Sequence, residues 1–240
     1  MALSLENKNI LITGSSDGLG KLLAIELAKH KSNIILHGRN EDKLKHILNE
    51  IQKIYPSHNH SYVVCDLNHP ETIKEKFSSI AKLDILVNNA GVWEEGNTID
   101  ISLERITELV NVNLSSYLLI SRLLLPNLLK SDFSQILNVI SISGYEVDVN
   151  ITHTIYQATK YALQGFSEAM TKEFTNQNLR VMGFYPGGMV TGLFKKAGCK
   201  YKTVEPWMFD PMESVEAIIF MLTRNQKVNI KRLDLITHMF

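Results

Sequence analysis

Tyr156 and Lys160 are the two residues of this sequence whose types and spacing best suit proton chemistry. Side chains four positions apart on a helix lie on one face, so the phenol and the ammonium would be neighbours. The positive charge would favour the phenolate and lower the tyrosine pKa, ordinarily near ~10, toward neutral pH. An ordinary amphipathic helix can carry the same pair, so this interpretation depends on the residues that precede it.

A glycine-rich turn follows residues 9–13, an apolar run that predicts a buried strand. Its glycines, Gly14, Gly18 and Gly20, have the spacing Gly-x3-Gly-x-Gly, and apolar residues at helical spacing come next. A pyrophosphate must approach the backbone closely at such a helix N-terminus, where free N–H groups and the helix dipole favour an anion. The stretch therefore predicts the start of a dinucleotide-binding unit.

The motifs together resemble those of the short-chain dehydrogenases/reductases in their order and spacing, from residue 5 or so to the C-terminus. The resemblance implies hydride transfer between a nicotinamide cofactor and a ketone or aldehyde with its alcohol. The motifs are Thr13-Gly14-x3-Gly18-x-Gly20, Asn89-Ala90-Gly91, Asn113, Ser141, Tyr156-x3-Lys160 and Pro186-Gly187.

The same resemblance gives each catalytic residue a role. Tyr156 would be the general acid or base, and Lys160 would lower its pKa and hold the nicotinamide ribose. Ser141 would donate a hydrogen bond to the substrate oxygen, and a water on the backbone carbonyl of Asn113 would complete a proton path. Ser143 competes with Ser141, because it stands thirteen positions before Tyr156, a common family spacing. We choose Ser141, since a strand end places a residue more rigidly than a loop does.

The cofactor-binding residues that the resemblance implies lie at the ends of predicted strands. Asp66 would bind the adenine; it also precedes Pro70 as a turn or helix cap, and we expect both roles. Thr191 would hold the nicotinamide carboxamide. The full set is Gly14, Ser15, Ser16, Asp17, Gly18, Leu19, Gly20, Arg39, Asp66, Leu67, Asn89, Ala90, Gly91, Tyr156, Lys160, Pro186, Gly187, Met189 and Thr191.

The end of the second predicted strand bears on the choice between NAD(H) and NADP(H). A carboxylate usually holds NAD(H) there, but this chain has Arg39. A guanidinium can form a fork to a 2′-phosphate, and the resemblance associates such an arginine with NADP(H). Asp17 opposes this, because NADP(H)-using relatives often carry a basic or hydroxyl residue in the glycine-rich turn. We predict NADP(H) over NAD(H).

An aromatic pocket and a lid are expected around the substrate. Residues 192–209 lack a clear period, which is typical of a lid over an active site. Its lysines, Lys195, Lys196, Lys200 and Lys202, would either meet an acidic substrate or remain solvated. The candidate substrate contacts are Trp93, Tyr145, His153, Met189, Phe194 and Trp207.

Strands and helices alternate along the 240 residues, which predicts one doubly wound, parallel, Rossmann-type α/β domain (1–240) of about seven strands. The longest predicted helix spans residues 102–130, and residues 153–174 form the helix that carries Tyr156. Leucines 118–125 make a broad apolar surface. That surface predicts either a homodimer or homotetramer interface or ordinary core packing.

Charge and composition argue against nucleic-acid binding, membrane association and metal binding. Formal net charge is zero, so no field of one sign would attract nucleic acid or an anionic membrane. The most apolar stretch, residues 117–129, is too short to span a bilayer, and we expect a cytoplasmic protein. His58 and His60 lack a carboxylate or cysteine partner, so we expect them to be solvated and no metal to be bound. A redox-sensing protein that binds the nucleotide with little catalysis is the alternative function.

Overall fold

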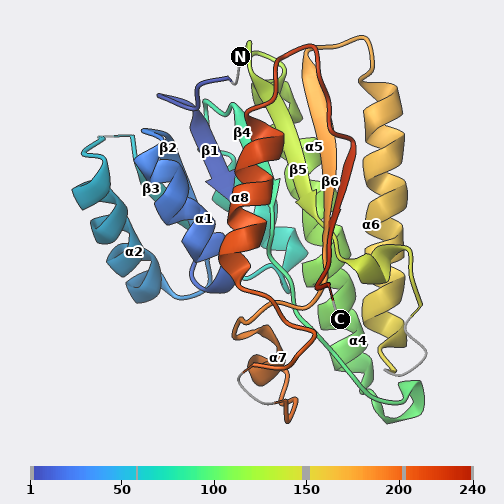
Figure 1. The fold of residues 1–240 in the computed structure, drawn as a ribbon. Coiled ribbons are helices and arrows are strands. Elements are labelled where there is room, and N and C mark those ends of the chain that lie inside the picture. The colour runs from blue at the N-terminus through green and yellow to red at the C-terminus, as the bar shows by residue number, and fades with distance from the viewer. Residues whose placement is uncertain (1–2, 58, 148–151, 202–203, 239–240) are drawn as a thin grey trace.

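Seven parallel strands form one sheet in the computed structural model, which describes residues 3–57, 59–147, 152–201 and 204–238 (Figure 1). Their order is β3-β2-β1-β4-β5-β6-β7, and all neighbours are parallel, which confirms the predicted doubly wound α/β fold. The strands are β1 (Asn9–Ile12), β2 (Asn33–Gly38), β3 (Ser61–Val64), β4 (Ile85–Asn88), β5 (Ser134–Val139), β6 (Leu179–Pro186) and β7 (Arg232–Leu235).

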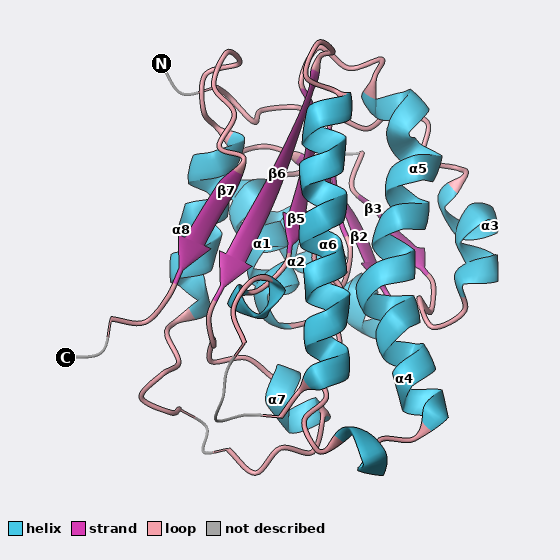
Figure 2. Cartoon of the chain, turned by 90° about the vertical axis from the view of Figure 1, so that its right-hand side faces the viewer, coloured by secondary structure: helices cyan, strands magenta, loops and turns pink. Residues whose placement is uncertain are grey.

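Helices cover both faces of the sheet, as the two views show (Figures 1 and 2). The strand order reverses between β1 and β4, and ligands of such sheets bind beyond the strand ends at this point. One face carries α1 (Gly18–Lys29), α2 (Glu41–Ile54) and α8 (Pro211–Leu222). The other face carries α3 (Ile73–Phe77), α4 (Leu103–Val110), α5 (Ser116–Leu128) and α6 (Thr154–Glu173). The short α7 (Leu193–Lys196) lies beyond the carboxyl ends of the strands.

Alternate residues of the central strands divide between two apolar cores. In β1, Ile10 and Ile12 pack in the core that contains α1 and α8, whereas Leu11 packs in the core that contains α5. All three are fully buried, and full burial of such a side chain contributes about 1.5–3 kcal/mol. Because helices cover both faces, the strands are continuous apolar runs rather than alternating ones.

A chain of buried side-chain hydrogen bonds fixes β4 and β5 to α5 and α6. Asn88 and Asn138 are partners in the β4–β5 register, and Asn88 Nδ2 donates to Asn138 Oδ1 at 2.9 Å. Asn88 Nδ2 also donates to Ser121 Oγ on α5 at 3.0 Å, and Asn138 Nδ2 donates to Ser167 Oγ on α6 at 2.9 Å. All four side chains are buried, so water cannot replace a lost partner.

The predicted long helix is present but is not uniform. It runs 26 residues from Leu103 to Leu128, and its middle turn, Asn111–Ser115, is a π-helix between α4 and α5. By length and composition alone this helix could cross a membrane, whereas the expectation above concerned only residues 117–129. Here it packs along the sheet with 44% of its most apolar window buried, as core helices of globular proteins do.

His60 is buried, which corrects the expectation of a solvated loop histidine. Its Nδ1 accepts a hydrogen bond from Ile34 N at 3.0 Å, and its Nε2 lies 2.7 Å from Tyr55 O. The ring thereby joins the end of α2 to β2, and burial lowers its pKa. His58 lies outside the described residues. Within the described ranges, no group of three histidine, cysteine or acidic side chains could hold a metal.

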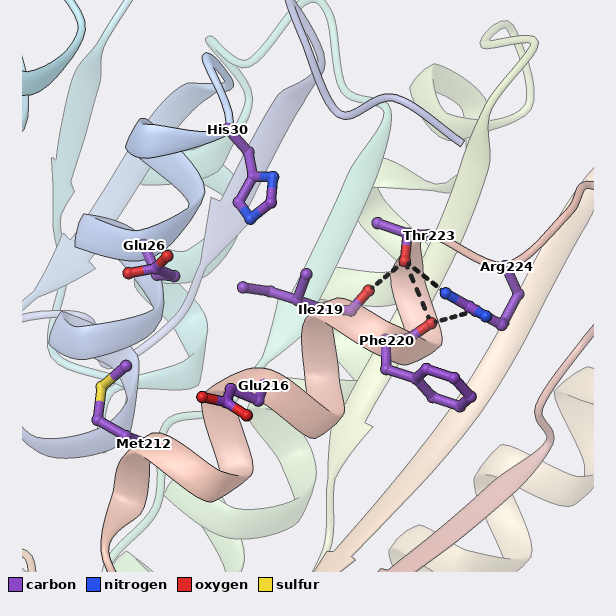
Figure 3. Close-up of a pocket in the computed structure, with 8 residues that line it drawn as sticks. All are labelled: Glu26, His30, Met212, Glu216, Ile219, Phe220, Thr223 and Arg224. Carbon is purple, nitrogen blue, oxygen red and sulfur yellow. Dashed lines mark hydrogen bonds between the residues drawn. The ribbon is translucent and has the colours of Figure 1, made fainter. Parts of the chain in front are cut away.

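A pocket between α1 and α8 contains none of the predicted site residues (Figure 3). At its α8 end, Thr223 Oγ1 donates to Ile219 O and Arg224 Nε donates to Phe220 O, each at 2.8 Å. These groups satisfy the last turn of the helix. The pocket is lined by Glu26, His30, Met212, Glu216, Ile219, Phe220, Thr223 and Arg224.

The buried asparagine chain gives a stability prediction. Asn138→Ala should lower the free energy of unfolding by about 1–3 kcal/mol, because Asn88 and Ser167 each lose a buried partner. Urea denaturation measures this change. Asn97→Ala is the control, since Asn97 is exposed and its loss should change stability by less than about 0.5 kcal/mol. Equal stability of Asn138→Ala and wild type would contradict the prediction.

Candidate active site

The turns after β1 and β4 approach each other so closely that only small residues fit between them. Gly14 has φ +66°, and a Cβ on it would lie 2.8 Å from Ala90 Cα. A Cβ on Gly20 would lie 2.5 Å from Gly14 O. Thr13 Oγ1 ties the two turns together, because it accepts hydrogen bonds from Asn89 N at 2.9 Å and Ala90 N at 3.0 Å.

A cavity of about 1030 Å³ opens at these turns and brings most of the predicted site residues together. Ser15 and Gly20 do not line it, and their role as cofactor contacts stays a prediction. Ser15 is fully buried, and its Oγ accepts a hydrogen bond from His37 N at 2.8 Å, so it shapes the turn. The predicted residues that line the cavity include Gly14, Ser16, Asp17, Gly18, Leu19, Arg39, Asp66, Leu67, Asn89, Ala90, Gly91, Ser141, Tyr156, Lys160, Pro186, Gly187, Met189 and Thr191.

His37, at the end of β2, holds the glycine-rich turn in place. Its Nδ1 accepts a hydrogen bond from Gly14 N at 3.1 Å, so Nε2 carries the proton and donates to Cys65 O at 3.2 Å. Burial lowers the pKa of His37 to about 4, which keeps the ring neutral and Nδ1 free to accept. His37 was not among the predicted site residues; its position beside the turn in a parallel sheet is the signal that would have identified it.

Asp17 has two partners, the N-terminus of α1 and Lys196. Its Oδ1 accepts a hydrogen bond from Gly18 N at 2.8 Å and caps α1. Its Oδ2 lies 2.7 Å from Lys196 Nζ on α7, and the hydrogen bond from Lys196 lowers the pKa of Asp17. The carboxylate is therefore balanced by a cation of the lid and does not face the cavity as a lone negative charge.

Arg39 and Asp66 lie together at the β2–β3 side of the cavity. Arg39 Nη1 is 3.9 Å from Asp66 Oδ2, and the Arg39 side chain is 62% exposed, so the guanidinium is accessible to a ligand. Asp66 Oδ1 accepts a hydrogen bond from Asn68 N at 3.0 Å, which is the turn-capping role expected of it. The residues directly after β2 are Arg39 and Asn40, and Asn40 caps α2.

A hydrogen bond joins the side chains of Tyr156 on α6 and Ser141 at the end of β5. Gly144 permits this approach, because a Cβ there would lie 3.0 Å from Lys160 O. Ser141 has φ 152° and ψ 156°, a strained backbone conformation of the kind that concentrates at functional sites. Ser143 also lines the cavity, but its backbone N–H donates to Ser141 Oγ at 3.1 Å. The structure thus pairs Ser141 with the tyrosine.

Burial dominates the electrostatics of Tyr156 and Lys160. It raises the pKa of Tyr156 to about 12, although the hydrogen bond with Ser141 acts in the opposite direction. It lowers the pKa of Lys160 to about 7. Lys160 Nζ donates to Val139 O at 3.3 Å and lies 5.6 Å from the centroid of the Tyr156 ring. The expected lowering of the Tyr156 pKa by Lys160 is not seen in this structure, because both groups are desolvated.

Two side chains bind the loop after β4: Asn113, from the π-helical turn, and Tyr117, from α5. Asn113 Oδ1 accepts from Val92 N at 2.8 Å, and its Nδ2 donates to Val92 O at 2.9 Å. Tyr117 Oη donates to Ala90 O at 2.9 Å and to Val139 O at 3.2 Å. Asn113 is not among the cavity-lining residues, so its visible role is to position this loop. Its water-mediated proton path stays a prediction.

Aromatic side chains gather beside Tyr156. The Trp93 ring centroid lies 4.4 Å from that of Tyr156, and His153 and Phe194 each lie 5.1 Å from Trp93. Trp207 lies 5.4 Å from Phe194. We call Trp93, His153, Phe194, Tyr201 and Trp207, which all line the cavity, the aromatic cluster.

Tyr145 is the predicted substrate contact that lies apart from the others. It does not line the cavity; the Arg232 guanidinium lies 3.8 Å from the centroid of its ring, and the Tyr185 ring lies 5.7 Å away. Tyr145 therefore packs toward β6 and β7. It follows the turn Ile142–Gly144, and a position after a turn does not fix the side to which a side chain points.

Trp207 also fastens the lid to the turn after β6. A Cβ on Gly188 would lie 2.2 Å from the Trp207 ring, so the indole lies directly on the glycine backbone. Phe209 N donates to Gly188 O at 3.1 Å, and Val190 N donates to Phe209 O at 3.0 Å. The lid segment and the Pro186-Gly187 motif are thus held together by main-chain bonds as well as by an aromatic ring.

The sequence analysis did not identify Arg105 and Glu108, which line the cavity from α4. Arg105 Nη1 lies 2.5 Å from Glu108 Oε2, its Nε donates to the Glu94 carboxylate, and its Nη2 donates to Trp93 O. The pair stands three positions apart on a helix, the spacing that brings side chains together. That spacing, on the helix after the Asn89 turn, is the signal that would have found it.

Comparisons with known proteins agree with this geometry. A family model described as short chain dehydrogenase matches residues 8–202. An uncharacterized oxidoreductase of Staphylococcus saprophyticus is 30% identical over 237 residues, which cover 95% of this chain and 96% of that one. A short chain dehydrogenase from Shigella flexneri complexed with NADP has a TM-score of 0.86 at 23% identity, covering 96% of this chain and 98% of that one. An alcohol dehydrogenase from Thermococcus sibiricus complexed with 5-hydroxy-NADP has a TM-score of 0.85 at 24% identity, covering 96% and 97%.

The lowered pKa of Lys160 predicts a pH dependence of stability. The unfolded chain binds this proton below pH 10.5, whereas the folded protein binds it only below about pH 7. Between these values the unfolded state binds more protons, so the contribution of Lys160 to the free energy of unfolding rises with pH. Urea denaturation of wild type and Lys160→Met across this range isolates the effect. The stability of wild type relative to Lys160→Met should increase with pH; a constant difference would contradict the pKa shift.

Proposed function

This chain belongs to the short-chain dehydrogenase family, and on that premise we propose that it is an NADP(H)-dependent oxidoreductase that reduces a ketone or aldehyde to its alcohol. The observation that carries the proposal is the hydrogen-bonded Ser141–Tyr156 pair beside Lys160, in a cavity that the glycine-rich turn also lines. A fold by itself hosts many functions, so the proposal depends on these side chains and not on the sheet.

The glycine-rich turn has the features that a dinucleotide requires. Gly14 and Gly18 both have positive φ, and the absence of Cβ atoms leaves the backbone accessible at the N-terminus of α1. Free N–H groups and the positive end of the helix dipole favour a pyrophosphate there. In this proposal Asp66 and Leu67 contact the adenine, and Thr191 contacts the nicotinamide carboxamide.

The reduction needs one proton and one hydrogen-bond donor from the protein. When bound, the cofactor supplies the hydride that the carbonyl carbon receives. Tyr156 donates its hydroxyl proton to the carbonyl oxygen, which completes the alcohol. Ser141 donates a hydrogen bond to the same oxygen as negative charge develops on it. The raised pKa of Tyr156 keeps the hydroxyl protonated at neutral pH, as a proton donor must be, while Lys160 holds the nicotinamide ribose.

The charges at the β2 end support NADP(H) as the cofactor. Arg39 is accessible and lines the cavity, and the chain has no carboxylate directly after β2 to repel a 2′-phosphate. Asp17, the residue that argued for NAD(H), is paired with Lys196. Solved relatives complexed with NADP have the same fold, which fits this choice.

Variants of the tyrosine and the two serines test the catalytic assignment. Tyr156→Phe should lower kcat by ~100-fold or more, because it removes the general acid. Ser141→Ala should lower kcat by ~100–1000-fold, the loss typical of a missing oxyanion donor. Ser143→Ala is the matched control and should change kcat far less. NADPH oxidation with a panel of ketones and aldehydes measures all three.

Two results would overturn this assignment. One is near-normal turnover by Tyr156→Phe, and the other is a larger loss in Ser143→Ala than in Ser141→Ala. Cofactor affinity should survive in every variant, since each keeps the turn and the fold. Cofactor binding by wild type without turnover of any carbonyl compound would favour the redox-sensing alternative.

Arg39→Ala should weaken NADPH binding by about 10-fold or more and leave NADH binding nearly unchanged. The reason is that a charge-assisted hydrogen bond to the 2′-phosphate contributes about 1.5–3 kcal/mol. Fluorescence titration with both reduced cofactors measures the change. Lys45→Ala, which removes an exposed cation from α2 that does not line the cavity, is the control. Preference of wild type for NADH, or equal NADPH affinity of the variant, would refute the proposal.

A further inference from the structure

The half of the cavity beside Tyr156 is walled by aromatic rings. The Trp93 ring meets the Phe194 ring edge to face at 76°, and Tyr201 lies 5.5 Å from Phe194 and 5.3 Å from Trp207. Ile142 and Leu193 line the same cavity. A reacting carbonyl at the Tyr156 hydroxyl must therefore place the rest of its molecule among these apolar faces. Aromatic faces prefer offset or edge-on contact with another flat ring.

Arg105, a cation that lines the cavity beside Trp93, already has two carboxylate partners. Arg105 uses Nε for Glu94, Nη1 for Glu108 and Nη2 for the backbone oxygen of Trp93. The side chains of the three charged residues are only 21–25% exposed, so these bonds are formed largely away from water. A ligand carboxylate could bind Arg105 only by displacing one of two carboxylates that are already in place.

The other described cations that line the cavity are committed elsewhere. Lys196 pairs with Asp17, Arg39 lies at the β2 end, and Lys160 donates to Val139 O behind the tyrosine. Lys195 and Lys200 are exposed and do not line the cavity, and Lys202 lies outside the described residues. The sequence left open whether the lid lysines meet an acidic substrate or remain solvated. The positions of the described lysines do not support an acidic substrate.

From these contacts we infer that the substrate is an uncharged aromatic carbonyl compound, without a carboxylate or phosphate, whose ring packs within the aromatic cluster. This inference rests on the proposed function for the reaction itself, but its recognition part depends only on the cavity. Arg105 faces two carboxylates, Glu94 and Glu108, so this group keeps one excess negative charge, and Glu146 also lines the cavity; both disfavour an anionic ligand. Among the described residues, Arg105, Lys160 and Lys196 already have partners, so an anion placed there would lose its hydration with little compensation.

Ligand binding can be followed at this site alone, because the two tryptophans of the chain, Trp93 and Trp207, both line the cavity. Three ketones make a matched set: acetophenone, its para-carboxylate 4-acetylbenzoate, and the aliphatic 2-octanone with the same number of carbons as acetophenone. Each is titrated against tryptophan fluorescence with and without NADP⁺, which permits no reduction, and corrected with free tryptophan. Acetophenone should bind at least ~10-fold more tightly than 4-acetylbenzoate and ~3-fold more tightly than 2-octanone.

Arg105 provides the variant test. Glu108→Gln removes one negative charge and leaves Arg105 Nη1 with a weaker, neutral acceptor that a carboxylate can displace, so it should raise the affinity for 4-acetylbenzoate relative to acetophenone by ~5-fold or more. Glu104→Gln is the matched control: it removes the same charge from the same helix, but Glu104 is exposed and does not line the cavity. The affinity ratio should stay unchanged in the control.

Equal or tighter binding of 4-acetylbenzoate by wild type would overturn the exclusion of anions, and tighter binding of 2-octanone would overturn the aromatic preference. An equal change in Glu108→Gln and Glu104→Gln would overturn the role of Arg105. Turnover is measured separately with NADPH. Selective binding of acetophenone without its reduction would refute the proposed reaction and leave the recognition of neutral aromatic compounds standing.

Discussion

The close contact between Gly14 and Ala90 is the constraint on which the rest of the site depends. Ala90 is held by the Thr13 hydroxyl through its N–H, and its carbonyl accepts from Tyr117 Oη. Tyr117 in turn bonds Val139 O, to which Lys160 also donates. A continuous series of contacts therefore runs from the glycine-rich turn to Lys160 on α6, across three strands of the sheet.

Charges in the cavity are organised as local pairs. Asp17 pairs with Lys196, and Glu108 pairs with Arg105. Lys160 is buried, and burial lowers its pKa to about 7, so it carries only part of a positive charge at neutral pH. This arrangement keeps the cost of burying charge low before any ligand arrives. It also leaves Arg39 as the accessible guanidinium at the end where a phosphate is proposed to bind.

The sequence predicted those features that depend on backbone spacing and periodicity. Glycine spacing placed the turn after β1, and the regular alternation of apolar runs predicted the parallel sheet. Side-chain direction was not predictable in the same way: Tyr145 turns to Arg232 and Ser15 to His37, because tertiary contacts decide orientation at loop positions. The burial that raises the pKa of Tyr156 was likewise not predictable, since spacing reveals a neighbouring lysine but not how far the tyrosine is removed from water.

The contact of Trp207 with Gly188 has a consequence for how this protein can diverge. No side chain fits at position 188 while an indole lies on it, so the two positions cannot drift independently. A smaller residue must replace Trp207 before a larger one can replace Gly188. The first replacement removes one ring of the aromatic cluster. Relatives that carry a larger residue at 188 should therefore have a smaller one at 207 and, with it, a remodelled substrate pocket. Covariation of this pair would record a change of substrate during evolution.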